Sequence, residues 1–138
     1  MALNWYPGSD LPFEPQHDRA ILALDVDSRG ETCVTASADH GLHLYNCRTG
    51  KRTKTLYSKR FGHTDWVTSC AILNDGRVLS ASMDKRLCLW ERTGVVCKDL
   101  SGHNGSISKV KVDAKNVAIS AAYDSALLVW QLDTLECA

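Results

Sequence analysis

The sequence lacks long hydrophobic runs, lacks an excess of either charge and confines proline to its first residues. Its apolar runs reach about five residues, whereas a membrane-spanning helix needs roughly 20, so we predict no membrane span. Lys plus Arg and Asp plus Glu number 16 each, and this zero formal charge argues against binding nucleic acid through bulk electrostatics. Residues 1–7 have neither the basic start nor the apolar centre of a signal peptide, so we expect a cytoplasmic or nuclear protein.

The prolines Pro7, Pro12 and Pro15 all lie within residues 1–16. Proline has no backbone N–H to donate to a strand ladder or a helix, so these positions exclude a long regular element. We therefore predict an irregular N-terminal arm over residues 1–16. The full sequence is 44% apolar and 23% charged, an ordinary balance for a globular domain.

One sequence pattern occurs twice, from Gly62 to Trp90 and again from Gly102 to Trp130. Each copy holds a His, a Ser, an Asp and a Trp at the same offsets: His63, Ser80, Asp84 and Trp90, then His103, Ser120, Asp124 and Trp130. A degenerate copy precedes them, with His17, Thr35, Asp39 and Tyr45 at the corresponding places. A repeat period of roughly 40 residues is what a propeller of four-stranded blades produces.

These motifs resemble the WD40-repeat β-propellers, and the resemblance covers residues 17–138. It implies an all-β chain of about three four-stranded antiparallel blades, which is a partial propeller. The degenerate repeat would span residues 17–60, the second repeat 61–100 and the third 101–138. We predict the fourth strands of the first two repeats at residues 54–57 and 95–100. The third repeat stops within its expected fourth strand, so we predict that the last blade is incomplete.

Three blades are fewer than the roughly 4–8 of a closed propeller. An arc of blades leaves an apolar face uncovered at each end. Three explanations stay open. The chain is a fragment of a longer protein, it pairs with a second copy of itself, or another protein supplies further blades. We expect self-association or a need for additional chain.

The resemblance also implies a hydrogen-bond network within each blade. In the family, the indole N–H of the Trp donates to the strand Ser, the His bonds that hydroxyl, and the turn Asp accepts from the His. By position this predicts one network around Trp90 and another around Trp130. Tyr45 replaces Trp in the first repeat and has no indole N–H, so we expect a broken or rearranged network there.

A Ser, a His and an Asp in contact also suggest the triad of a hydrolase. That reading needs an exposed nucleophile, an oxyanion hole and a substrate cleft. Ser80 and Ser120 fall within predicted strands, and two copies of one active site would be unusual. We predict no enzyme activity and no catalytic or cofactor-binding residue.

Partner contacts in WD40 proteins often come from the residues three and five after the loop His and from the residue before the turn Asp. Mapped onto this sequence, these positions are Trp66, Thr68 and Met83 in the second repeat, Ser106, Ser108 and Tyr123 in the third, and Ala20, Leu22 and Ala38 in the first. Aromatic residues and Met are enriched at binding sites. The resemblance therefore predicts a non-catalytic scaffold that binds proteins or peptides, although Trp66 and Tyr123 packing on neighbouring loops is an alternative.

Residues 48–60 carry six cations and no acid: Arg48, Lys51, Arg52, Lys54, Lys59 and Arg60. Such a run is typical of a solvated outer strand, where charge also blunts a sheet edge. It also supports an alternative function, an RNA- or ribonucleoprotein-associated WD40 component.

The six cysteines include no pair at the Cys-x-x-Cys spacing of zinc ligands. Cys33, Cys70 and Cys88 fall in segments predicted as strands, so we interpret them as reduced, small core residues. We predict no metal site.

Overall fold

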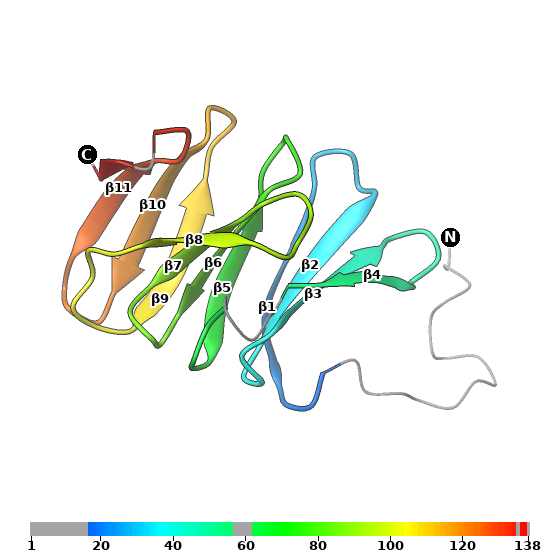
Figure 1. The fold of residues 1–138 in the computed structure, drawn as a ribbon, viewed down its shortest axis with the longest axis horizontal. Helices are drawn as coiled ribbons and strands as arrows, with labels where there is room; N and C mark the ends of the chain where they lie inside the picture. Colours follow the sequence, from blue (N-terminus) through cyan, green and yellow to red (C-terminus); the bar gives the residue numbers. More distant parts are fainter. Residues whose placement is uncertain (1–16, 57–61, 135, 138) are drawn as a thin grey trace.

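The computed structural model describes residues 17–56, 62–134 and 136–137, without the side chains of 136–137 (Figure 1). The arm predicted over residues 1–16 and the link 57–61 lie outside the described residues. No helix long and apolar enough to cross a membrane occurs in the part of the chain that the structure describes.

The described chain forms three antiparallel sheets of four strands each, and in every sheet the strands lie in chain order. The first sheet contains β1 (Ile21–Val26), β2 (Thr32–Ser37), β3 (Leu42–Asn46) and β4 (Arg52–Thr55). The second contains β5 (Val67–Ile72), β6 (Val78–Ser82), β7 (Leu87–Trp90) and β8 (Cys97–Leu100). The third contains β9 (Ile107–Val112), β10 (Val117–Ala122), β11 (Leu127–Gln131) and β12 (Glu136–Cys137). The all-β prediction of about three four-stranded blades is confirmed.

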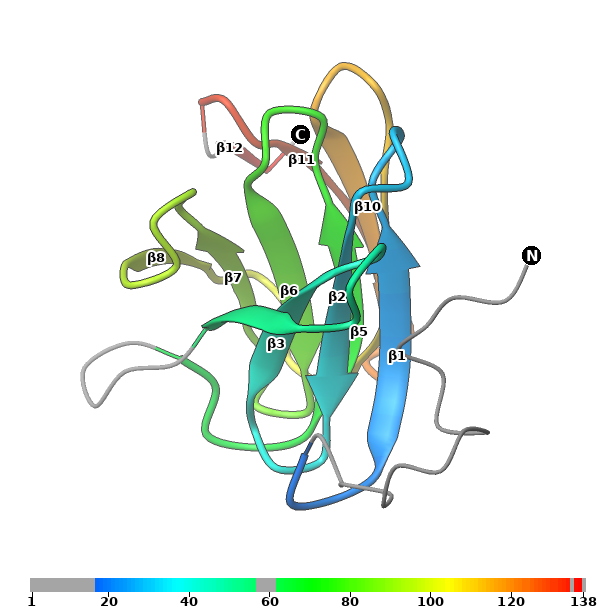
Figure 2. The ribbon, with the colours of Figure 1, turned by 90° about the vertical axis from the view of Figure 1, so that its right-hand side faces the viewer.

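The three sheets stand face to face like the blades of a propeller, with β1, β5 and β9 next to one another along one side (Figures 1 and 2). Alternation along β6 explains why both faces of the second blade are apolar, because successive side chains point to opposite faces. Val78 faces the first blade, whereas Leu79 and Ala81 face the third. One cluster, between the first two blades, includes Val34, Leu42, Leu44, Val67 and Trp90. The other, between the second and third, includes Leu79, Leu87, Leu89, Ile107 and Trp130.

Polar side chains also join neighbouring blades. Asp25 of β1 accepts a hydrogen bond of 2.9 Å from the Ile72 amide of β5. Ser69 of β5 accepts one of 3.2 Å from the Val110 amide of β9. These bonds run from the first strand of one blade to the first strand of the next, so they fix the register of neighbouring blades as well as their contact.

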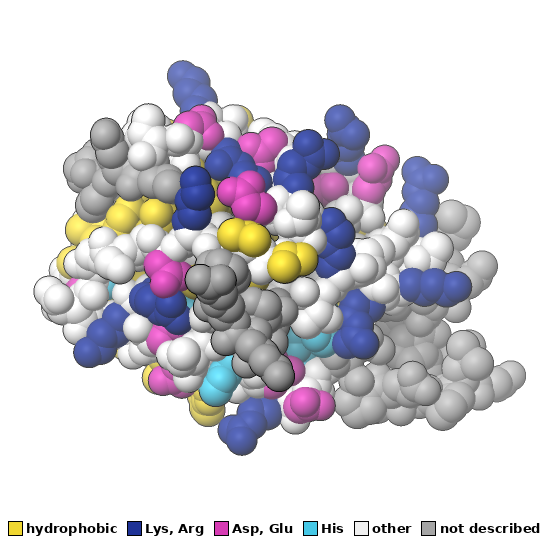
Figure 3. Space-filling view, viewed as in Figure 1, with side chains coloured by type: hydrophobic (Ala, Val, Ile, Leu, Met, Phe, Trp, Pro, Cys, Tyr) yellow, Lys and Arg dark blue, Asp and Glu magenta, His cyan; other side chains and the backbone are white. Residues whose placement is uncertain are grey.

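The outer faces of the first and third blades expose apolar side chains. Leu79 and Leu87 of the second blade are fully buried, but their counterparts Ile119 and Leu127 in the third blade are 44% and 66% exposed. On the first blade, Leu24 is 66% exposed. Figure 3 shows hydrophobic side chains gathered over the third sheet and Lys and Arg side chains over the β3–β4 hairpin. Within the described residues, both outer faces thus resemble the covered faces between blades.

The sequence interpretation misplaced the starts of two outer strands. It assigned residues 54–57 and 95–100, whereas β4 is Arg52–Thr55 and β8 is Cys97–Leu100. Gly50, with φ of 69°, closes the β3–β4 turn early, so β4 begins sooner than its apolar residues suggested. In the next blade the Glu91 amide bonds the Val96 carbonyl at 3.0 Å, which leaves Val95 and Val96 in the turn. Tyr57, the last residue of the first assignment, lies outside the described residues.

Candidate functional site

A buried chain of hydrogen bonds crosses the second blade. Trp90 Nε1 donates to Ser80 Oγ at 3.0 Å, and Ser80 Oγ lies 2.7 Å from His63 Nε2. His63 Nδ1 lies 2.9 Å from Asp84 Oδ2. A carboxylate only accepts, so Nδ1 carries a proton. In the tautomer protonated at Nδ1 alone, Nε2 accepts from the Ser80 hydroxyl, which itself accepts from Trp90.

A tight turn fixes the Asp of this network in every blade. The residue after each Asp takes a left-handed backbone conformation: His40, Lys85 and Ser125, with φ of 73°, 73° and 66°. The Asp Oδ1 then accepts from the amide two residues on, which is a local pattern that Asp favours in turns. These amides are Gly41, Arg86 and Ala126, at 2.9, 3.0 and 2.8 Å. The other carboxylate oxygen is left to face the His.

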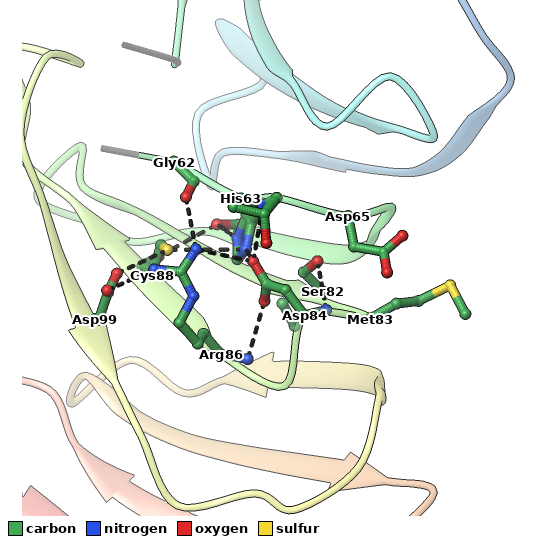
Figure 4. A network of polar contacts seen from close by, with 12 residues as sticks. Gly62, His63, Asp65, Ser82, Met83, Asp84, Arg86, Cys88 and Asp99 are labelled. Carbon is green, nitrogen blue, oxygen red and sulfur yellow. Dashed lines mark hydrogen bonds and ion pairs between the residues drawn. The ribbon is translucent and has the colours of Figure 1, made fainter. Parts of the chain in front are cut away.

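Asp84 has further partners that hold its charge (Figure 4). Its Oδ2 accepts from the Thr64 amide at 3.1 Å and from Arg86 at 3.0 Å. Burial alone would raise the pKa of Asp84, but the hydrogen bond from His63 and the two amide donors outweigh it, so the pKa lies well below its usual range. Arg86 also bonds the Gly62 carbonyl at 2.8 Å and Asp99 at 2.6 Å. The sequence reasoning missed Arg86, although a cation two residues after the turn Asp was a usable signal.

The third blade repeats the arrangement. Trp130 Nε1 donates to Ser120 Oγ at 2.9 Å, and His103 lies 2.6 Å from Ser120 and 3.1 Å from Asp124. The Asn104 and Ala126 amides, followed by His103, lower the pKa of Asp124 to about 2. The structure therefore brings together all four residues that the resemblance grouped in this repeat.

The first blade keeps half of the network and rearranges the rest. His17 lies 2.7 Å from Thr35 Oγ1 and 2.8 Å from Asp39 Oδ2. Burial opposes ionisation of Asp39, yet the Gly41 amide and His17 lower its pKa. Tyr45, in the Trp position, places its hydroxyl 3.0 Å from His43 Nδ1.

Sequence reasoning missed His43 in this blade. It is buried and stacks on His17 with ring centroids 3.8 Å apart. It lies two residues before Tyr45 on β3, hence on the same face of the strand. That alternation was the signal that could have placed it beside the phenol.

The Ser–His–Asp groups do not have the geometry of a hydrolase. Ser80 and Ser120 are fully buried within β6 and β10, so a substrate cannot reach either hydroxyl. Each hydroxyl also accepts the indole N–H of a buried Trp. The arrangement satisfies buried polar groups across the strands of one blade, which is a structural role.

The predicted partner-binding residues of the second and third blades form one connected rim. The Met83 amide donates to the Trp66 carbonyl at 3.0 Å, and the Tyr123 amide donates to the Ser106 carbonyl at 2.9 Å. Ser106 Oγ then bonds the Met83 carbonyl at 3.2 Å and joins the two blades. Trp66 is 43% exposed and Tyr123 is 78% exposed.

The other predicted rim positions differ in exposure. Thr68 is half-buried and its hydroxyl bonds the Ala81 and Ile107 carbonyls. Ser108 is exposed and bonds the Ala121 carbonyl at 3.1 Å. In the first blade Ala20 and Leu22 are exposed, whereas Ala38 is buried. The two largest exposed side chains of the rim are thus Trp66 and Tyr123.

The cysteines predicted within strands lie there. Cys33 is in β2, Cys70 in β5 and Cys88 in β7. Burial raises the pKa of Cys70 to about 12, and burial together with the neighbouring Cys47 raises the pKa of Cys33 to about 11. Such thiols are poor nucleophiles at neutral pH, as expected for small core residues.

Comparison with known proteins now adds to this geometry. Residues 50–91 match the profile of the family "WD domain, G-beta repeat". The WD40 repeats of RRP9 superpose on 90% of this chain with a TM-score of 0.83, at 19% sequence identity, and show the same propeller fold. One repeat of this chain thus matches the WD40 family, and its three sheets have the fold of WD40-repeat blades. Its three blades cover 39% of the RRP9 chain, so they correspond to an arc of that propeller.

The sequence relatives of this chain are longer proteins. The Set1 complex component swd2 of Schizosaccharomyces pombe is 26% identical over 126 residues, which cover 85% of this chain and 33% of swd2. Telomerase protein component 1 of Mus musculus is 25% identical over 121 residues, or 87% of this chain and 5% of that protein. The chain thus spans a third or less of the length of both relatives.

Proposed function

We propose that this chain is a non-catalytic scaffold that binds a partner protein or peptide on the rim formed by Trp66, Met83, Ser106 and Tyr123. The connected rim carries the proposal, because it presents two large aromatic side chains from neighbouring blades beside a Met. Tyr and Trp are enriched among the residues that dominate binding energy. The relative swd2 is, by its name, a component of a complex, which supports a role in protein assembly.

The chemistry of the rim favours a partner segment with an apolar anchor next to a basic residue. Figure 4 shows Asp65 and Met83 pointing to the same side of the second blade. Asp65 Oδ1 accepts a hydrogen bond of 2.8 Å from the Trp66 amide, so the carboxylate stays next to the backbone of Trp66. An apolar side chain can pack on Trp66 and Met83 while a Lys or Arg of the partner meets Asp65.

Selection from a library of random peptides tests this proposal. Peptides that bind the parent chain are expected to lose at least about tenfold in affinity for Trp66→Ala and for Tyr123→Ala, as for residues at a binding hot spot. Val95→Ala is the matched control, because Val95 is also an exposed apolar residue but lies in the turn before β8, away from the rim residues. Peptides that bind Trp66→Ala and Tyr123→Ala as tightly as the parent would show that the rim is not the site.

The basic stretch gives the RNA-associated alternative no comparable support. Arg48, Lys51, Arg52 and Lys54 are exposed on or beside the β3–β4 hairpin, and Lys59 and Arg60 lie outside the described residues. Lys54 bonds the Arg92 carbonyl at 2.6 Å, so this ammonium already joins the first two blades. Retention of RNA that falls steeply with salt would favour this alternative over the peptide-binding rim.

We also propose that the exposed outer faces are covered in the working assembly. Ile119 and Leu127 are the counterparts of Leu79 and Leu87, which the third blade covers. The solved WD40 domain of RRP9 also extends well beyond the matched arc. Further blades, from additional chain or from a second copy, would bury these faces as the third blade buries Leu79 and Leu87. A location in the cytoplasm or nucleus stays a prediction.

A further inference from the structure

Three potential metal ligands converge on one face of the β7–β8 hairpin. Cys88 Sγ, Cys97 Sγ and a carboxylate oxygen of Asp99 all lie within 4.8 Å of one another. The strand register produces this cluster, because Cys88 pairs with Asp99 and Trp90 pairs with Cys97. Cys97 and Asp99 are therefore two residues apart on the same face of β8, beside Cys88 on β7.

The spacing of these atoms suits a small thiophilic cation. Zn²⁺ binds thiolate sulfur at about 2.3 Å in a tetrahedral arrangement, which places ligand atoms roughly 3.3–3.8 Å apart. Cys88 Sγ already lies 3.3 Å from Asp99 Oδ1. Two sulfurs and one carboxylate oxygen leave the fourth tetrahedral position for water.

Arg86 orients the carboxylate for this role. Its guanidinium holds Asp99 Oδ2 at 2.6 Å, so the other oxygen, Oδ1, is the one turned to Cys88 (Figure 4). Arg86 is itself held by Asp84 at 3.0 Å and by the Gly62 carbonyl at 2.8 Å. Hydrogen bonds of this kind commonly fix metal-ligating carboxylates.

The local charge also favours a cation. Asp84 and Asp99 carry two negative charges against the single positive charge of Arg86. Two thiolates would add two further negative charges, which a divalent ion would largely neutralise. The negative charges of the ligands would then be paired with the positive charge of the ion, as charges partly removed from water must be.

The blade fold does not require this set of residues. In the first blade the corresponding positions of β3 and β4 carry His43, Arg52 and Thr55. In the third blade Leu128 occupies the place of Cys88. No metal site was expected because the cysteines lack the Cys-x-x-Cys spacing, whereas here strand pairing joins Cys88 with residues nine and eleven positions further along the chain. We propose that Cys88, Cys97 and Asp99 bind a thiophilic divalent cation of the Zn²⁺ class.

Titration of the reduced protein with Co²⁺ tests the site. One equivalent of Co²⁺ is expected to give a sulfur-to-cobalt charge-transfer band with visible bands of tetrahedral cobalt, and Zn²⁺ is expected to displace it. Cys97→Ser should abolish the charge-transfer signal of the site, and Asp99→Asn should weaken binding about tenfold or more. Cys33→Ser is the matched control, because Cys33 and Cys47 are another neighbouring thiol pair, and it should bind as the parent does.

Asp99→Asn also keeps the test valid if Cys97→Ser folds poorly, since Asp99 is exposed at the blade edge. Absence of a charge-transfer band in the parent would overturn the proposal. So would a band that survives Cys97→Ser but disappears in Cys33→Ser, or an Asp99→Asn protein that binds Co²⁺ as tightly as the parent.

Discussion

Replacing Asp84 with Ala removes the carboxylate that anchors the buried network of the second blade. The parent side chain accepts from His63 at 2.9 Å, from the Thr64 amide at 3.1 Å and from the Arg86 amide at 3.0 Å. Its side chain is only 4% exposed. In Asp84→Ala the His63 Nδ1–H is left buried without its acceptor, whereas water can replace the carboxylate at the exposed Thr64 amide.

The expected loss of stability follows from that one unpaired donor. Leaving a buried polar group without a hydrogen bond costs about 1–3 kcal/mol. For a chain of this size, 1 kcal/mol corresponds to a shift in Tm of about 4 °C, so Asp84→Ala should melt about 4–12 °C below the parent. The fall in Tm should lie near about 4 °C if the His63 ring moves so that its Nδ1–H bonds water.

Thermal unfolding followed by circular dichroism measures this difference. Asp18→Ala is a suitable control, because Asp18 is exposed and only its backbone amide takes part in a described hydrogen bond. Asp84→Asn keeps an acceptor for His63 and should lose less than Asp84→Ala. The double variant His63→Leu/Asp84→Ala should lose less than the sum of its single changes, because it removes donor and acceptor together.

An Asp84→Ala protein that melts within error of Asp18→Ala would refute the reasoning. So would strict additivity in the double variant, because independent effects would mean that His63 and Asp84 do not stabilise each other.

Three other changes test different parts of the structure. Ser80→Ala leaves the fully buried Trp90 N–H without an acceptor and should lower the free energy of unfolding by about 1–3 kcal/mol in chemical denaturation, unless Trp90→Phe is also present. The pKa of Asp84 is lowered on folding, so its carboxylate stabilises the fold fully above its unfolded pKa of about 3.9. This stabilisation is lost as pH falls below that value. The parent's Tm should therefore fall more steeply than that of Asp84→Asn between about pH 4 and pH 2. Leu127→Lys places a charge on the exposed apolar face and should reduce self-association in light scattering, whereas a parent chain that stays a compact monomer across concentrations would contradict the covered-face proposal.

The blade architecture was predictable because its signal is both periodic and local. Apolar residues alternate along the strands, and the Asp of each turn recurs four residues after the strand Ser or Thr, as in Ser80 and Asp84. Each of these features depends on neighbours in the chain. The period of the repeats therefore predicted the fold class, and the resemblance to WD40 repeats, mapped by position, implied the residues brought together around Trp90 and Trp130.

The features that escaped prediction depend on how far a side chain reaches and on how the strands pair. The Tyr45 hydroxyl lies 3.0 Å from His43 Nδ1, because a phenol carries its polar atom at the far end of the ring. The approach of Cys88 to Cys97 and Asp99 depends on the pairing of β7 with β8. The sequence did not predict this pairing, and β8 begins at Cys97 and not at residue 95. Arg86 reaches both Asp84 and Asp99 only after that register is set.

The bonds that join one blade to the next make the chain a short linear array with unequal members. Within residues 17–56 and 62–134, the second blade is coupled on one side through Asp25 and Ile72 and on the other through Ser69 and Val110, whereas each outer blade has such a bond on one side only. In such an array local opening costs least at the ends and most in the middle. Trp66 and Met83 thus stand on the blade that opens last, while Tyr123 stands on one that opens more readily. A partner that spans both would slow the fraying of the third blade and would pay for that ordering out of its own binding energy.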